Sequence, residues 1–83
     1  MIVEVAKAEN RYWLKMAQYD ADLVTAIKQW FPTRRRGWDA RRRLWWVDQS
    51  QADGLASMLA WHQCDVRHVG YELIIPTEKR VTA

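Results

Sequence analysis

Apolar residues recur with two different periods along this chain, and the changes between these periods constrain its fold more than any other feature. Residues 2–7 are rich in β-branched side chains, and residues 12–16 alternate in the period of two that a half-buried strand shows. Glu9 and Asn10 between these segments suit a turn. The chain is therefore predicted to open with a β-hairpin.

A helical pattern follows the hairpin. Asp20 has the short side chain of an N-cap residue, and Tyr19 before it is expected to fold back on the first turn as a hydrophobic staple. Apolar residues then recur at intervals of three and four until Pro32 ends the pattern. They are Leu23, Val24, Ile27, Trp30 and Phe31. A helix of about three turns is predicted here.

The second half of the chain repeats this order. Gly37, Asp39 and Ala40 stand where a turn would reverse the chain. Residues 44–47 form a short apolar run with strong strand propensity. These features predict either a second hairpin or a strand preceded by a tight basic loop.

A second helix and a final strand are expected to complete the domain. Ser50 and Asp53 resemble a capping box, and residues 55–62 place their apolar side chains on one helical face. Residues 66–76 alternate again and predict one long strand, or a kinked pair, that ends at the proline. Residues 77–83 are polar and are expected to form a frayed tail.

The predicted order of elements is strand, strand, helix, strand, strand, helix, strand. This order is typical of an α+β fold in which two helices pack on one face of a mainly antiparallel sheet. No Pro/Gly-rich linker divides the chain, so residues 1–76 are expected to form one small domain with a thin core.

Six arginines within residues 34–43 are the strongest functional signal in the sequence. With one aspartate among them, this window carries a net charge of +5, and the rest of the chain sums to −2. So concentrated a charge costs self-repulsion, which predicts a partner that brings negative charge, phosphate above all. The arginines form two triplets: Arg34, Arg35 and Arg36, then Arg41, Arg42 and Arg43.

Arginine rather than lysine at all six positions favours direct contact over a solvated loop without a specific partner. The planar guanidinium makes bidentate hydrogen bonds to phosphate and stacks on bases. We expect the two triplets to grip phosphates on either side of residues 37–40, with Lys15, Lys28 and Arg67 extending the surface. If four or five side chains neutralise phosphates, affinity for duplex DNA should fall with a log-log salt slope of about −4.

Six tryptophans in so short a chain must lie either in the core or on a contact surface. Four of them are interpreted as packing residues: Trp30, Trp38, Trp45 and Trp61. Trp46 directly follows Trp45, so on a strand the two rings point to opposite faces. We therefore expect Trp46, and Trp13 on its own strand, to lie on the open face, where a ring can stack on an unpaired base.

Several of these residues together resemble a known module. Residues 19–28, then Arg36-Gly37-Trp38-Asp39, then Trp45, and then a helix with Leu55 and Leu59 resemble the HARP domain of annealing helicases. The pattern covers residues 11–75 and is also similar to small DNA-binding modules at the N-terminus of some phage and repair helicases. The resemblance implies a non-catalytic domain that binds DNA at forks or at junctions of single and double strands. Unlike those helicases, the chain has no Gly-x-x-x-x-Gly-Lys phosphate loop.

The sequence indicates neither catalytic nor metal chemistry. His62, Cys64 and His68 lie near one another with Asp65 among them, but their spacing does not match paired zinc ligands. Cys64 has no recognisable acid/base or oxyanion-hole companion and is interpreted as a small apolar residue at a helix end. We expect no catalytic residue, no metal site and no cofactor.

The leading hypothesis is a non-catalytic nucleic-acid-binding protein that selects forked, junction or single-stranded DNA. It would recognise structure rather than sequence, because no predicted helix carries base-reading side chains for a major groove. RNA stays open as a ligand, since it also offers phosphates and stackable bases. The alternative is a small protein-interaction module whose basic, aromatic surface inhibits or recruits a partner, for instance from the replication or repair machinery.

The remaining features favour a soluble intracellular protein. No run of about 18 apolar residues could span a membrane, the first residues do not resemble a secretory signal, and the basic window is not the face of an amphipathic helix. A single cysteine suits a reducing compartment, so we expect the cytoplasm, and the nucleoid if the ligand is DNA. Both a monomer and a homodimer are compatible with the sequence.

Overall fold

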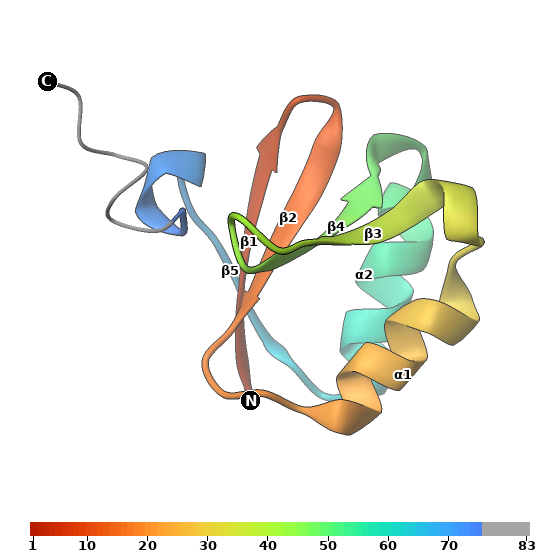
Figure 1. The fold of residues 1–83 in the computed structure, drawn as a ribbon. Coiled ribbons are helices and arrows are strands. Elements are labelled where there is room, and N and C mark those ends of the chain that lie inside the picture. Colours follow the sequence, from red (N-terminus) through yellow and green to blue (C-terminus); the bar gives the residue numbers. More distant parts are fainter. Residues whose placement is uncertain (76–83) are drawn as a thin grey trace, which may run out of the picture.

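Two hairpins and one parallel strand build a single five-stranded sheet (Figure 1). The computed structural model describes residues 1–75, so the predicted tail at residues 77–83 lies outside the described part of the chain. The elements are β1 (Ile2–Ala8), β2 (Arg11–Met16), α1 (Ala21–Trp30), β3 (Arg36–Asp39), β4 (Leu44–Asp48), α2 (Ala52–Trp61) and β5 (Asp65–His68). The strand order is β3-β4-β2-β1-β5, and every neighbouring pair is antiparallel except β1 with β5. Both helices lie on one face, which confirms the predicted α+β fold.

The β1–β2 hairpin forms around the predicted turn. Ala8 pairs with Arg11 across a two-residue loop of Glu9 and Asn10. The loop residues have positive φ angles of 58° and 63°, which a type I′ turn requires. Asparagine tolerates this backbone better than most residues, so Asn10 favours the hairpin locally.

Helix α1 begins and ends where the sequence predicts. Asp20 is its N-cap, because its carboxylate accepts a hydrogen bond of 3.1 Å from the backbone N–H of Leu23. The helix ends at Trp30, just before Pro32. The predicted staple is wrong, since Tyr19 stays 80% exposed instead of folding onto the first turn.

Helix α2 begins without the side-chain cap predicted for it, since its N-cap residue is Gln51 and makes no capping hydrogen bond through its side chain. A 3-10 turn, Gln49–Gln51, precedes the helix, and Asp48 caps this turn by accepting hydrogen bonds from the backbone N–H and the hydroxyl of Ser50. The predicted capping box at Ser50 is therefore wrong.

Gly54 in the first turn of α2 lies against Phe31, where an added Cβ would be 3.2 Å from the ring. The glycine thus lets α2 approach the end of α1 closely.

The long strand predicted over residues 66–76 is also wrong. β5 ends at His68, and a 3-10 helix, Tyr71–Leu73, follows. The apolar alternation continues because the chain leaves the sheet edge and crosses the face opposite the helices, where Ile74 is buried in one cluster with Trp13. Figure 1 shows this segment in blue, on the other side of the sheet from α1 and α2.

Both faces of the sheet therefore carry an apolar core. The larger core lies between the sheet and the helices, and its most deeply buried side chains include Val3, Ile27, Val47 and Met58. The smaller core lies on the opposite face and contains Ala6, Trp13, Leu44 and Ile74. The sheet face opposite the helices, which was expected to be open, is thus partly covered, and this decides which tryptophans are accessible.

Candidate nucleic-acid interface

The basic window forms the hairpin at one edge of the sheet. The first arginine triplet occupies a 3-10 turn, Thr33–Arg35, and the first position of β3. The second triplet belongs to the turn over residues 40–43 that joins β3 to β4. This confirms a second hairpin, but the turn predicted at residues 37–40 is wrong in position, because Gly37 pairs with β4 inside the strand. The two triplets lie at opposite ends of β3, about 10 Å apart along the strand.

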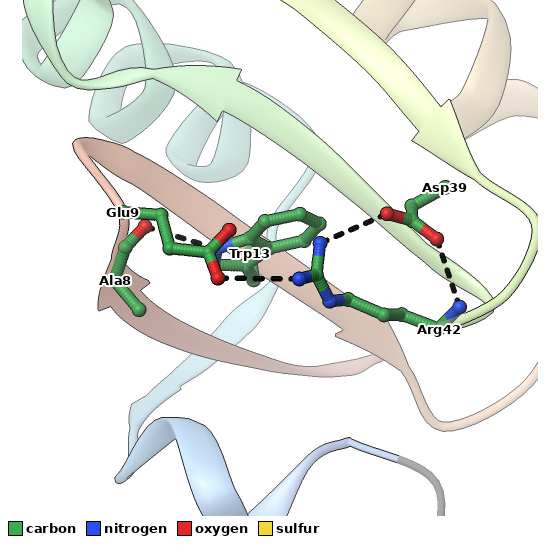
Figure 2. A network of polar contacts seen from close by, with 5 residues as sticks. All are labelled: Ala8, Glu9, Trp13, Asp39 and Arg42. Carbon is green, nitrogen blue, oxygen red and sulfur yellow. Dashed lines mark hydrogen bonds and ion pairs between the residues drawn. The ribbon is translucent and has the colours of Figure 1, made fainter. Parts of the chain in front are cut away.

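Arg42 connects this hairpin to the rest of the sheet (Figure 2). Its guanidinium donates to Asp39 at 2.9 Å and to Glu9 at 3.2 Å, and its backbone N–H donates to Asp39 at 2.9 Å. The guanidinium also lies 4.7 Å from the ring centroid of Trp13, a cation–π contact. Arg42 is therefore engaged inside the protein and has a structural role.

The contacts around Asp39 fix the turn in one geometry. The backbone N–H of Arg42, followed by the charge of its guanidinium, holds the pKa of Asp39 below the ordinary value of 3.8, against the opposing effect of burial. The backbone carbonyl of Asp39 accepts a hydrogen bond of 2.7 Å from the N–H of Arg43. Arg43 has a positive φ of 58°, so the turn closes through a residue in the left-handed region.

Arg35 and Arg36 also make contacts within the protein. Arg35 forms an ion pair of 3.5 Å with Asp48 at an exposed position, where such pairs contribute little stability. The side-chain and backbone donors of Ser50 lower the pKa of Asp48, so its carboxylate is ionised at neutral pH. Nε of Arg36 donates to the backbone carbonyl of Phe31 at 3.3 Å.

Arg34, Arg41 and Arg43 are exposed, and within residues 1–75 they form no ion pair. They come from both ends of β3, so an extended anion that follows the hairpin could contact all three. The described part of the chain thus offers three unengaged arginines, fewer than the four or five assumed from the sequence.

Trp13 lies on the face opposite the helices, as expected, but it is fully buried there. Its indole N–H donates to the carbonyl of Ala8 at 3.0 Å, and its ring centroid lies 5.8 Å from that of Tyr71. The expectation that Trp13 offers an open ring to a base is wrong, because residues 71–75 pack over this face.

Trp46 lies on the same face and is half-buried. The guanidinium of Arg11 is 3.8 Å from its ring centroid. The ring also lies against Gly37, so closely that an added Cβ would be 2.6 Å from it. Trp46 is therefore on the expected face but already has contacts within the protein. Arg11 was not among the predicted site residues, although its position two residues before Trp13 places it on this face.

An open apolar groove of about 630 Å³ lies on the helix side of β3 and β4. Trp38 and Trp45, which pair across these strands, form one wall with ring centroids 5.7 Å apart. Trp38 is 51% exposed, so its interpretation as a packing residue is wrong; it lies on an edge strand. Trp45 is half-buried and packs against the larger core, as expected. The other apolar lining residues are Leu14, Met16, Tyr19 and Val24.

Three cationic residues line the same groove: Lys15, Lys28 and Arg43. Nζ of Lys28 lies 6.0 Å from the ring centroid of Trp45. The structure thus brings two of the three expected additional cations to the arginine hairpin. It excludes the third, because Arg67 is on β5 at the opposite sheet edge, about 19 Å away in strand spacings, and pairs with Asp65 at 3.4 Å.

Trp30 and Trp61 do not pack as predicted. They are 41% and 77% exposed, respectively. Each is the last residue of its helix and follows the residues that the helix buries. The helical spacing that includes Trp30 in the apolar face does not show where the packing surface ends.

The sparse cysteine and histidine cluster forms no recognisable chemical site. Burial raises the pKa of the Cys64 thiol, which reduces its reactive thiolate fraction. In residues 1–75, no three His, Cys, Asp or Glu side chains gather where they could hold a metal ion. Over the same residues, neither helix has the length and apolar character needed to cross a membrane.

Comparisons with protein-family models, with curated proteins and with solved structures found no match to this chain. The resemblance to the HARP domain therefore stays a proposal, carried by the residues that suggested it.

Proposed function

We propose that this protein is a non-catalytic nucleic-acid-binding protein whose β3–β4 hairpin contacts backbone phosphates. The observation that carries the proposal is the exposure of Arg34, Arg41 and Arg43, which have no ion pair within residues 1–75. Their guanidinium groups suit bidentate bonds to phosphate, and Arg42 and Asp39 hold the turn that presents two of them.

The helices support recognition of the backbone rather than of base sequence. A helix that reads the major groove needs neutral or basic side chains facing the phosphates. Here α1 exposes Asp22 in its first turn and a single cation, Lys28, in its last turn, whereas α2 exposes Asp53 and contains no lysine or arginine. Neither helix therefore offers a basic face, and the hairpin is the better contact surface. The resemblance to the HARP domain favours DNA, at forks, junctions or single strands, as the ligand.

A pair of matched double variants tests this function. Arg41→Gln with Arg43→Gln removes two hairpin cations, and Lys7→Gln with Arg67→Gln removes two exposed cations from β1 and β5. Fluorescence anisotropy with forked, duplex and single-stranded DNA would measure affinity at two salt concentrations. We expect the hairpin variant to bind about tenfold more weakly or worse, and the control to bind nearly as the wild type does.

Equal losses in the two variants would show only a dependence on net charge and would contradict the hairpin site. Absence of binding by the wild type even at low salt would overturn the nucleic-acid function. The search would then turn to an acidic protein partner for the same surface.

A further inference from the structure

We propose that the groove beside Trp38 holds one unpaired nucleobase of the bound strand, stacked on the Trp38 ring. This inference rests on the proposed function and assigns the strand state that the site selects. Trp38 is the half-exposed tryptophan next to the arginine turn, whereas Trp13 is buried and Trp46 is in contact with Arg11.

The groove has the shape and lining that a stacked base requires. Trp45 supports Trp38 from one side, with 5.7 Å between ring centroids and an interplanar angle of 52°. Leu14 and Val24 are buried side chains in the lining, so the groove ends on the apolar core. Its volume of about 630 Å³ lies within the range of ordinary ligand pockets. A flat, apolar ring system can therefore enter beside Trp38 without displacing the fold.

The charges at the groove favour a nucleotide over an apolar peptide segment. Lys15, Lys28 and Arg43 line it, and among residues 1–75 no carboxylate does. Nζ of Lys28 lies 6.0 Å from the Trp45 ring centroid, so a cation stands beside the aromatic wall. A nucleotide fits both features of the groove, because its planar base can stack on the aromatic ring and its phosphate can pair with the cations.

Placement of a base in this groove selects unpaired strands. Inside a duplex both faces of each base are covered by its neighbours, so an internal base reaches Trp38 only after it unstacks, at a cost of a few kcal/mol. The exposed arginines contact phosphates of either strand state. The hairpin would therefore supply general affinity, and Trp38 would supply the preference for single strands.

Trp38→Ala, compared with Trp61→Ala, tests the inference. Trp61 is a matched control because it is 77% exposed and lies at the end of α2. Affinities would be measured for (dT)10, (rU)10 and a blunt duplex, with thermal unfolding to check each variant. We expect Trp38→Ala to weaken binding of whichever single strand the wild type binds by about tenfold, and duplex binding by less than twofold. Trp61→Ala should change neither.

A second readout keeps the test independent of folding defects. Lys28→Gln should weaken single-strand binding severalfold without loss of thermal stability, because Lys28 is exposed on α1.

The inference is wrong if Trp38→Ala and Trp61→Ala bind the single strand equally, or if Trp38→Ala weakens binding of the duplex and of the single strand to the same extent. If the protein still binds DNA in that case, and binding still depends on Arg41 and Arg43, the proposed function stands without the stacked base. If the wild type binds none of the three ligands, both proposals fail.

Discussion

Gly37 lies so close to the Trp46 ring that a larger residue does not fit at this position of the hairpin. A Cβ at this position would lie 2.6 Å from atoms of the Trp46 ring, whereas at Gly70 the nearest obstacle is the flexible carboxylate end of Glu72. We expect Gly37→Ala to lower the free energy of unfolding by about 1–3 kcal/mol, since the rigid indole must shift. Gly70→Ala, the control, should change it by less than about 0.5 kcal/mol. Urea unfolding would measure both, and equal stability of the two variants would contradict the packing described for Trp46.

Some residue-level features were predictable because they depend on neighbours in sequence. Asp20 caps α1, and the turn forms at Glu9 and Asn10, since short-range hydrogen bonding and backbone preference decide both. The exposure of the tryptophans was not predictable in this way. Trp13 is buried and Trp38 is half-exposed because of which segments cover each face of the sheet. That covering depends on residues far away in the chain.

The element that organises the candidate site is the β3–β4 turn, and Asp39 makes its stability depend on pH. The folded-state pKa of Asp39 is below 3.8, so its ionised form stabilises the fold above that pH and the contribution disappears as pH falls through the folded value. We expect the stability difference between the wild type and Asp39→Asn to be constant from about pH 5 to 7 and to shrink towards pH 2.5. Urea titrations across this range would measure it. A difference that does not change with pH would show that the Arg42 contacts do not favour the ionised form.

At the level of elements, the hairpins and helices could be predicted from local periodicity, whereas the structure of residues 66–75 could not. The alternation after residue 66 is real, but it reflects burial against two different surfaces rather than one strand. The parallel pairing of β5 with β1 joins distant segments and leaves no local pattern to read. For the same reason, the sequence could not show that Arg67 lies at the sheet edge away from the arginine hairpin.

In the whole molecule, the positive charge of residues 34–43 lies together at one edge of the sheet. The sequence located this charge correctly, but it could not show how the arginines divide between structural and exposed roles. Arg42 serves the fold through Asp39 and Glu9, while Arg34, Arg41 and Arg43 are exposed without an ion pair in residues 1–75. The aromatic groove beside them was not visible in the sequence, because Trp38, Lys28 and Tyr19 meet only in the folded chain.

The salt dependence of duplex DNA binding measures the proposed phosphate contacts, because its slope counts the phosphates that the protein neutralises. The measurement compares the wild type with a variant in which Arg34, Arg41 and Arg43 are each replaced by glutamine. If all three contact phosphates, the log-log slope of the variant should be shallower by about 2.7. An unchanged slope would contradict the proposed phosphate contacts and would mean that the exposed arginines of this hairpin do not touch the nucleic-acid backbone.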